Sequence, residues 1–152
     1  MTNRHGQGAT SEGNASPEFR LRIVTAPDEI DQLNHVSNVV YLNWVLRVAT
    51  AHSDAVGFTW PAYQELGSVF MVSRHEIDYL RPAVADDEID LVTWIEDWKG
   101  ASCIRCTSIR RVRDDRELAR ARTKWVMVSL DRNRPTRIPA QVKEGFSQLP
   151  TM

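Results

Sequence analysis

The spacing of hydrophobic residues changes twice along the chain, dividing it into a strand, a helix and a group of strands. Residues 19–24 alternate between apolar and polar side chains, as a first strand would. From Val39 to Val56 the apolar residues recur broadly around the helical period, which predicts one long helix that ends at Gly57, with Pro61 beyond it. Four strand-like runs follow, at residues 69–80, 88–98, 101–112 and 118–130.

The breaks between these four runs are short and contain residues typical of turns: Arg81-Pro82 with Asp86-Asp87, Lys99-Gly100, and residues 113–116. Because parallel neighbours would need crossover helices, such gaps favour an antiparallel meander. The last run has an apolar face and a basic face, formed by Ala119, Ala121, Trp125 and Met127 and by Arg120, Arg122 and Lys124. In the second run, Val92, Trp94 and Trp98 are expected to share a face. This order of elements predicts an α+β fold with one helix laid across a sheet.

The length and composition fit one soluble globular domain of 152 residues, of which 42% are hydrophobic and 26% are charged. Residues 1–17 are rich in Thr, Asn, Gly and Ser and contain no apolar stretch, which predicts a disordered tail rather than a signal peptide. We therefore expect a folded domain over residues 18–147 and a short tail over residues 148–152. No run of about 18 apolar residues is present, so no membrane span is expected, and we expect a cytoplasmic protein.

The net charge of −1 argues against nucleic acid as the main partner, but the charge is unevenly distributed. Between Arg105 and Arg137 there are eleven Lys and Arg residues against four Asp and Glu residues, a local charge of +7. Such a region suits an anionic ligand, for example a phosphorylated cofactor. Alternatively, four of the arginines solvate a hairpin tip beside Asp114 and Asp115, namely Arg110, Arg111, Arg113 and Arg116.

The two cysteines, Cys103 and Cys106, form a C-x-x-C pattern that is often found at metal and redox sites. Here they lie within a predicted strand, where positions three apart point to opposite faces of the sheet. The two thiols therefore cannot hold one ion together, and no second Cys/His pair follows at the spacing of a zinc finger. We expect two buried structural thiols, no metal site and no separate cofactor.

Residues able to carry out chemistry gather where a polar loop meets the predicted helix. Asp31, His35, Asn38 and Tyr41 follow the pattern D-x3-H-x2-N-x2-Y. A carboxylate can act as a base or a nucleophile, and the unpaired backbone N–H groups at a helix N-terminus can hold a developing oxyanion. The pattern therefore suits acyl-transfer chemistry. The alternative is an ordinary helix start in which Asn38 is the N-cap, while Asp31 and His35 are solvated loop residues.

Residues 29–42 read Glu-Ile-Asp-Gln-Leu-Asn-His-Val-Ser-Asn-Val-Val-Tyr-Leu. This segment resembles the D-x-D-x-x-G-H-V-N-N-x-x-Y-L motif of the 4-hydroxybenzoyl-CoA thioesterase-like family of hotdog proteins. Weaker similarities extend the resemblance over residues 18–147, at residues 75–83, 125–131 and 134–139. Three positions depart from the motif, namely Glu29, Asn34 and Ser37. Asn34 replaces a glycine but tolerates a left-handed backbone, and the family's key carboxylate corresponds to Asp31.

The resemblance implies a hotdog fold, in which a five-stranded antiparallel sheet wraps around one long central helix. It also implies hydrolysis of an acyl-CoA or aryl-CoA thioester to the free acid and CoA, which is substrate and not cofactor. Asp31 would be the nucleophile or the general base, the backbone N–H of Asn38 would contribute to the oxyanion hole, and His35 would orient the loop or bond to Asp31. The substrate-binding residues would be Tyr41, Trp44, Arg81, Lys99, Gly100, Ser102 and Arg137.

Hotdog proteins form their sites between two subunits, so the resemblance further implies a homodimer or a homotetramer. A second hotdog lineage has its carboxylate inside the central helix, but Val39 to Ala51 contains no Asp or Glu, which favours the loop carboxylate. Two other interpretations stay open. One is a non-catalytic acyl-CoA-binding domain, which has no need of Asp31, and the other is a hotdog hydratase or dehydratase. The acyl group could be carried on CoA or on an acyl carrier protein.

Overall fold

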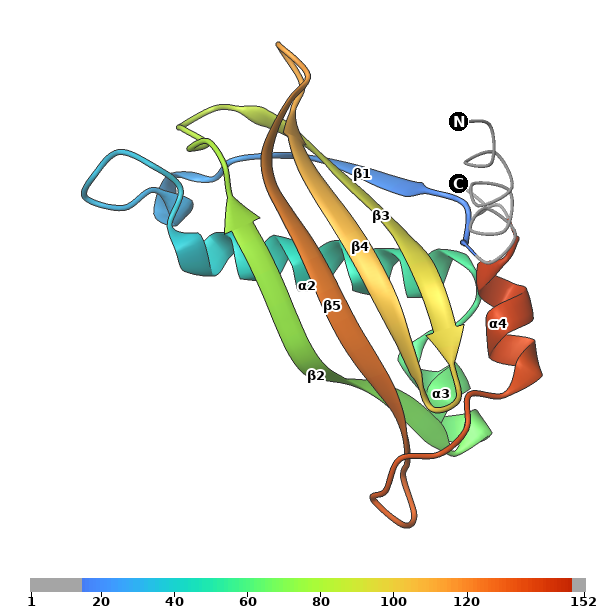
Figure 1. Ribbon diagram of the computed structural model, residues 1–152. Helices are drawn as coiled ribbons and strands as arrows, with labels where there is room; N and C mark the ends of the chain where they lie inside the picture. The colour runs from blue at the N-terminus through green and yellow to red at the C-terminus, as the bar shows by residue number, and fades with distance from the viewer. Residues whose placement is uncertain (1–14, 149–152) are drawn as a thin grey trace, which may run out of the picture.

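The computed structural model describes residues 15–148. Its elements follow the chain in this order (Figure 1): β1 Phe19–Val24, the 3-10 turn η1 Pro27–Glu29, α2 Asn38–Ala55, α3 Trp60–Leu66, β2 Ser68–Tyr79, β3 Glu88–Lys99, β4 Ser102–Arg111, β5 Arg116–Ser129 and α4 Ala140–Phe146. All five predicted strands are confirmed, with ends that differ by at most two residues. The predicted tails lie almost entirely outside the described residues.

The five strands form one antiparallel sheet in the order β1-β3-β4-β5-β2. Strands β3, β4 and β5 form the expected meander, but the prediction that β2 lies beside β3 was wrong. Residues 80–87 are longer than a hairpin loop of about two to five residues, and they cross the end of the sheet (Figure 1). As a result β2 pairs with β5, and both β1 and β2 are edge strands.

Helix α2 packs one apolar face against the sheet, behind which it runs in Figure 1. Its buried residues recur at the three- and four-residue spacing of one helix face: Tyr41, Trp44, Val45, Val48, Ala49 and His52. They meet side chains from four strands, including Phe19 and Ile23 of β1, Ile89 and Leu91 of β3, Ile109 of β4 and Leu118 of β5. This cluster fixes the direction of α2 and therefore the place where the helix begins.

Two short helices complete the far end of the molecule. Pro61 was expected only to prevent the long helix from continuing, but it lies in the first turn of α3, where proline is well tolerated. Helix α4 brings Val142 and Phe146 into a second cluster with Ile95, Cys103 and Met127. The pairing of β3 with β4 shifts between Ile95 and Asp97, so the expectation that Trp98 shares a face with Trp94 was wrong. Trp98 instead packs 6.0 Å from the ring of Phe146.

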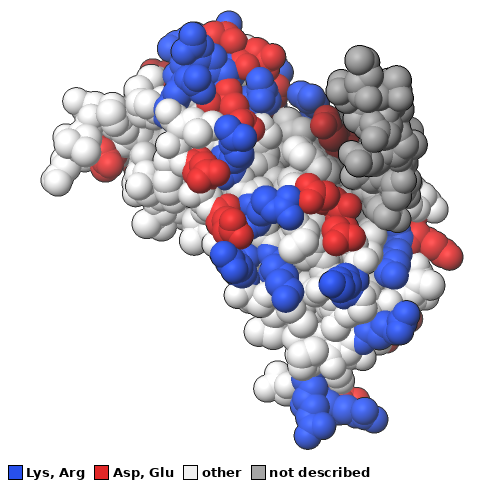
Figure 2. All heavy atoms as spheres, viewed as in Figure 1, with Lys and Arg blue, Asp and Glu red and all other residues white. Residues whose placement is uncertain are grey.

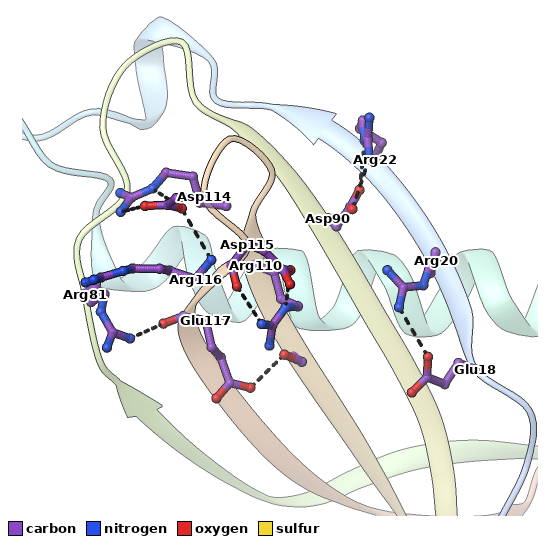
Figure 3. Close-up of polar contacts among 12 residues, drawn as sticks. Glu18, Arg20, Arg22, Arg81, Asp90, Arg110, Asp114, Asp115, Arg116 and Glu117 are labelled. Carbon is purple, nitrogen blue, oxygen red and sulfur yellow. Dashed lines mark hydrogen bonds and ion pairs between the residues drawn. The ribbon is translucent and has the colours of Figure 1, made fainter.

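Charged side chains of both signs are interleaved on the sheet face turned away from α2 (Figure 2). At the β4–β5 hairpin, Arg110 pairs with Asp115 at 2.9 Å (Figure 3). In the same hairpin, Arg111 pairs with Asp114 at 2.9 Å. Arg113 reaches the buried carboxylate of Asp87 at 3.4 Å. Arg110 and Arg111 therefore have carboxylate partners in the hairpin tip, as the second interpretation of the basic segment expected, whereas Arg113 pairs with the loop before β3. None of the helices within residues 15–148 is long and apolar enough to cross a membrane.

Candidate active site

The loop before α2 folds back on itself around Asp31. The backbone N–H of Asp31 donates to the carbonyl of His35 at 2.8 Å, and Ile30 pairs with Val36 as an isolated bridge. Oxygen Oδ1 of Asp31 accepts the N–H groups of Leu33 at 2.8 Å and His35 at 3.4 Å. The loop turns through Asn34, whose φ of 63° is the left-handed conformation expected of this residue. Within residues 15–148, Oδ2 of Asp31 has no hydrogen-bond partner, so it is available to a ligand.

Helix α2 begins one residue earlier than a capping role for Asn38 requires. Ser37 is the N-cap, with φ −62° and ψ 143°, and Asn38 is the first helical residue. The Ser37 hydroxyl makes no capping bond, and the backbone N–H groups of Asn38 and Val39 have no acceptor among the described residues. Such unpaired donors carry the partial positive charge of the helix N-terminus.

An open cleft of about 480 Å³ lies between this helix start and the end of β2. It is lined by Asp31, Leu33, His35, Val36, Ser37, Asn38, Tyr41, Tyr79, Leu80, Arg81 and Pro82. The cleft thus brings together five of the residues selected from the sequence. The His35 imidazole makes no hydrogen bond within residues 15–148, and its contact with Asp31 is through the backbone. Arg81 donates to the carbonyl of Glu117 at 2.8 Å, which fixes one side of the cleft (Figure 3).

Tyr41 and Trp44 hold the cleft in place from within the core. The Tyr41 hydroxyl accepts the N–H of Ala83 at 2.9 Å, and burial raises the pKa of Tyr41, so the hydroxyl stays neutral. The Trp44 indole donates to Glu29 Oε2 at 3.2 Å, and Glu29 Oε1 accepts the N–H of Ala26 at 2.7 Å. Glu29, the first departure from the family motif, therefore ties the loop to α2. Neither Glu29 nor Tyr79, the cleft's other tyrosine, was selected from the sequence.

Replacing Tyr41 with phenylalanine is expected to lower the free energy of unfolding by about 1–3 kcal/mol, because the buried Ala83 N–H loses its acceptor. Urea unfolding of both proteins measures the difference. Tyr79→Phe is the matched control, since this hydroxyl donates to the Asn38 carbonyl at 3.3 Å from a side chain that is 47% exposed. An equal loss in the two variants would contradict a special role for the Tyr41 hydroxyl.

The remaining predicted substrate contacts lie at the opposite end of the sheet. Lys99, Gly100 and Ser102 form the β3–β4 turn, in which Gly100 has a φ of 60° and Ser102 donates to the Lys99 carbonyl at 3.2 Å. Arg137 is brought beside this turn by the bond from Ile138 N–H to the Gly100 carbonyl at 3.0 Å. At about 3.3 Å per residue, the 12-residue β3 separates this turn from the cleft by more than 30 Å. One chain therefore does not bring the two groups together.

Sequence reasoning missed a buried polar cluster beneath the C-terminal half of α2. Arg105 is only 4% exposed, and its Nη1 donates to His52 Nδ1 at 2.9 Å and to Thr93 Oγ1 at 3.0 Å. We counted Arg105 only in the charge of the basic segment, although strand alternation puts it on the same face as Cys103 and Ile109. Cys106 lies on the other face, 3.1 Å from Glu96, so the two thiols are buried on opposite faces as predicted.

His52 makes the stability of the protein sensitive to acid. Burial and the charge of Arg105 lower the pKa of His52 to about 3, against 6.5 for an ordinary histidine. Between these values the unfolded chain binds the extra proton, so the free energy of unfolding falls as the pH falls from about 6.5 towards 3.

We expect His52→Gln to make this decline shallower, measured by urea unfolding at a series of pH values. Burial also lowers the pKa of His75, so a residual slope of the same sign is expected. An unchanged slope in the variant would exclude His52 as the group responsible.

The sequence matches the thioesterase-like superfamily over residues 25–146, and the chain belongs to this family. It is 28% identical over 123 residues to the acyl-CoA thioesterase YbgC of Haemophilus influenzae, covering 80% of this chain and 89% of that protein. It is 24% identical over 110 residues to a chloroplastic oleoyl-acyl carrier protein thioesterase of Coriandrum sativum, covering 68% of this chain but only 30% of that protein.

The structure resembles the DHNA-CoA thioesterase of Staphylococcus aureus with a TM-score of 0.76 and 15% identity, covering 86% of this chain and 89% of that one. This likeness confirms the hotdog fold.

Proposed function

We propose that the protein hydrolyses an acyl-CoA or aryl-CoA thioester at the cleft beside the start of α2. The observation that carries the proposal is the free Oδ2 of Asp31 in the same cleft as Asn38, whose backbone N–H has no acceptor among residues 15–148. Membership of the thioesterase-like superfamily supports the reaction class. The names of YbgC and of the Staphylococcus aureus enzyme support CoA as the carrier.

In this mechanism the thioester carbonyl oxygen lies at the N-terminus of α2 and accepts the N–H of Asn38. The negative charge that develops on this oxygen is then stabilised by a donor that needs no reorganisation, and one such donor typically contributes about 3 kcal/mol. Asp31 either attacks the carbonyl carbon or removes a proton from the attacking water. The carbon–sulfur bond breaks, and water supplies the oxygen of the acid and the proton of the thiol. His35 and Tyr41 position the loop and the cleft wall.

We further propose that the active form is a homo-oligomer in which two chains complete each site. Strand β2 is an edge strand of twelve residues whose outer backbone groups are unpaired within the described chain, which suits pairing with a second copy. In such an assembly, Lys99, Gly100, Ser102 and Arg137 would contact the CoA phosphates at the site of the other subunit.

A panel of acyl-CoA thioesters with a thiol-trapping dye tests this function and its two alternatives. We expect release of free CoA thiol from at least one short, long or aryl thioester, in proportion to the acid formed. Tight binding of the thioesters without thiol release would instead favour a binding domain. Loss of enoyl absorbance without free thiol would favour a hydratase. The same panel on acyl carrier protein distinguishes the two carriers.

A further inference from the structure

A second cavity, separate from the cleft, lies at the other end of α2. It has a volume of about 210 Å³ and lies between α2, α3, α4 and the sheet. Its walls are mostly apolar and include Phe58, Tyr63, Phe70, Ile95, Trp125 and Phe146. The fifteen-residue separation between Asn38 and Ser53 along α2 corresponds to about 22 Å. The cavity is therefore too far from Asp31 of the same chain to be part of its cleft.

The guanidinium of Arg105 is an unusual group to find in the lining of an apolar cavity. Its Nη1 group donates to His52 and Thr93, but Nε and Nη2 have no acceptor among residues 15–148. Among the same described residues, no carboxylate forms an ion pair with Arg105. Burial lowers the pKa of Arg105 to about 10, so the group remains charged at neutral pH. A buried cation with unused donors is costly to keep unless an anion joins it.

The other buried polar atoms near this cavity have the same deficit of acceptors. The Trp125 indole N–H, also in the cavity wall, has no partner. Because Arg105 donates to Nδ1 of His52, the neutral imidazole carries its hydrogen on Nε2, and this atom is also without a partner. The deficit therefore consists entirely of donors that lack acceptors. A ligand that supplies oxygen lone pairs would satisfy the two donors that line the cavity, Arg105 and Trp125.

We propose that this cavity binds a carboxylate carried on a small apolar body, with the carboxylate oxygens accepting from Arg105 and the Trp125 indole. A planar carboxylate matches the paired N–H groups of a guanidinium, and aromatic walls suit a phenyl ring or a short alkyl chain. A cavity of about 150 Å³ holds benzene, so about 210 Å³ leaves room for a ring with a short acidic side chain. The exposed Asp54 is the one acidic wall residue, and it would disfavour ligands with a second carboxylate at the opening.

Binding of 3-phenylpropionate, compared with its uncharged amide, tests the proposal by isothermal titration calorimetry. The full chain is expected to bind the acid at least about tenfold more tightly, because hydrogen bonds between a guanidinium and a carboxylate are stronger than those between neutral groups. Arg105→Met should abolish the preference, and Arg47→Met, the same change on the exposed side of α2, should not. Thr50→Trp, which fills the cavity from an exposed position, should abolish binding of both compounds.

Equal affinity of the full chain for acid and amide, or no binding of either, would overturn the proposal even if Arg105→Met failed to fold. The proposal is independent of the proposed hydrolysis, so Asp31→Asn should bind 3-phenylpropionate as the unchanged chain does. The source of the carboxylate is tested by comparing hydrolysis of hexanedioyl-CoA with that of hexanoyl-CoA. A preference for the first that is lost in Arg105→Met identifies the carboxylate as part of the acyl group. If the two thioesters are hydrolysed at equal rates while 3-phenylpropionate still binds, the ligand of the cavity is a free carboxylic acid.

Discussion

Asp31→Asn is expected to lower kcat/KM for thioester hydrolysis by about 100- to 10,000-fold, with little change in stability. The size of the loss follows from removing a general base or nucleophile. The small change in stability follows from the geometry of the loop. The side-chain carbonyl of asparagine can occupy the position of Oδ1 and accept the same N–H groups of Leu33 and His35. The substitution therefore removes the charge and the free oxygen while it keeps the bonds that shape the loop.

The comparison needs a carboxylate that is exposed, nearby and outside the cleft. Asp28 in η1 meets these conditions, and Asp28→Asn makes the same change in charge three residues earlier. Thiol release over a range of thioester concentrations gives kcat and KM for all three proteins, and thermal unfolding shows whether each is folded. If Asp31→Asn kept the kcat/KM of the unchanged chain, the carboxylate would have no part in the reaction. If Asp28→Asn lost as much activity, the effect would be one of local charge.

The sequence was informative wherever a local pattern determines the structure. Alternation located β1 at residues 19–24, and the turn residues Lys99 and Gly100 located the hairpin between β3 and β4. Strand neighbours are not local, so the pairing of β2 with β5 could not be read from the composition of the segment at residues 80–87. The bulge after Ile95 is equally hidden, because a single unpaired residue reverses the face of Trp98 without any change in composition.

The candidate site shows the same division between local and tertiary information. The loop that carries Asp31 and the helix start at Asn38 are adjacent in sequence, so a motif can identify both. The bond from Trp44 to Glu29 and that from Ala83 to Tyr41 join segments whose orientation depends on how α2 lies against the sheet. Arg105 was missed for a different reason. It was considered only for its charge within the basic segment, while its place in the alternation of β4 indicated the interior.

Trp44→Ala is the substitution expected to destabilise the fold most, by about 3–5 kcal/mol. The Trp44 side chain is 1% exposed, its ring packs 5.3 Å from that of Tyr41, and its indole N–H bonds to Glu29. Truncation leaves a large cavity beneath the sheet and removes one of the two donors to the Glu29 carboxylate. Domains are usually stable by about 5–15 kcal/mol, so this single change is a large part of the total. Urea unfolding measures it directly.

Two further variants separate the contributions of the ring and the N–H group. Trp44→Phe keeps most of the apolar volume but breaks the bond to Glu29, so it should lose less stability than Trp44→Ala. Because Glu29 lies two residues before Asp31, Trp44→Phe should also lower kcat more than it changes KM, since a loosened loop holds the carboxylate less well in the transition state. Trp60→Ala removes an indole that is 55% exposed and should be the mildest of the three. Equal destabilisation by Trp60→Ala and Trp44→Ala would mean that burial of Trp44 does not stabilise the packing of α2 on the sheet.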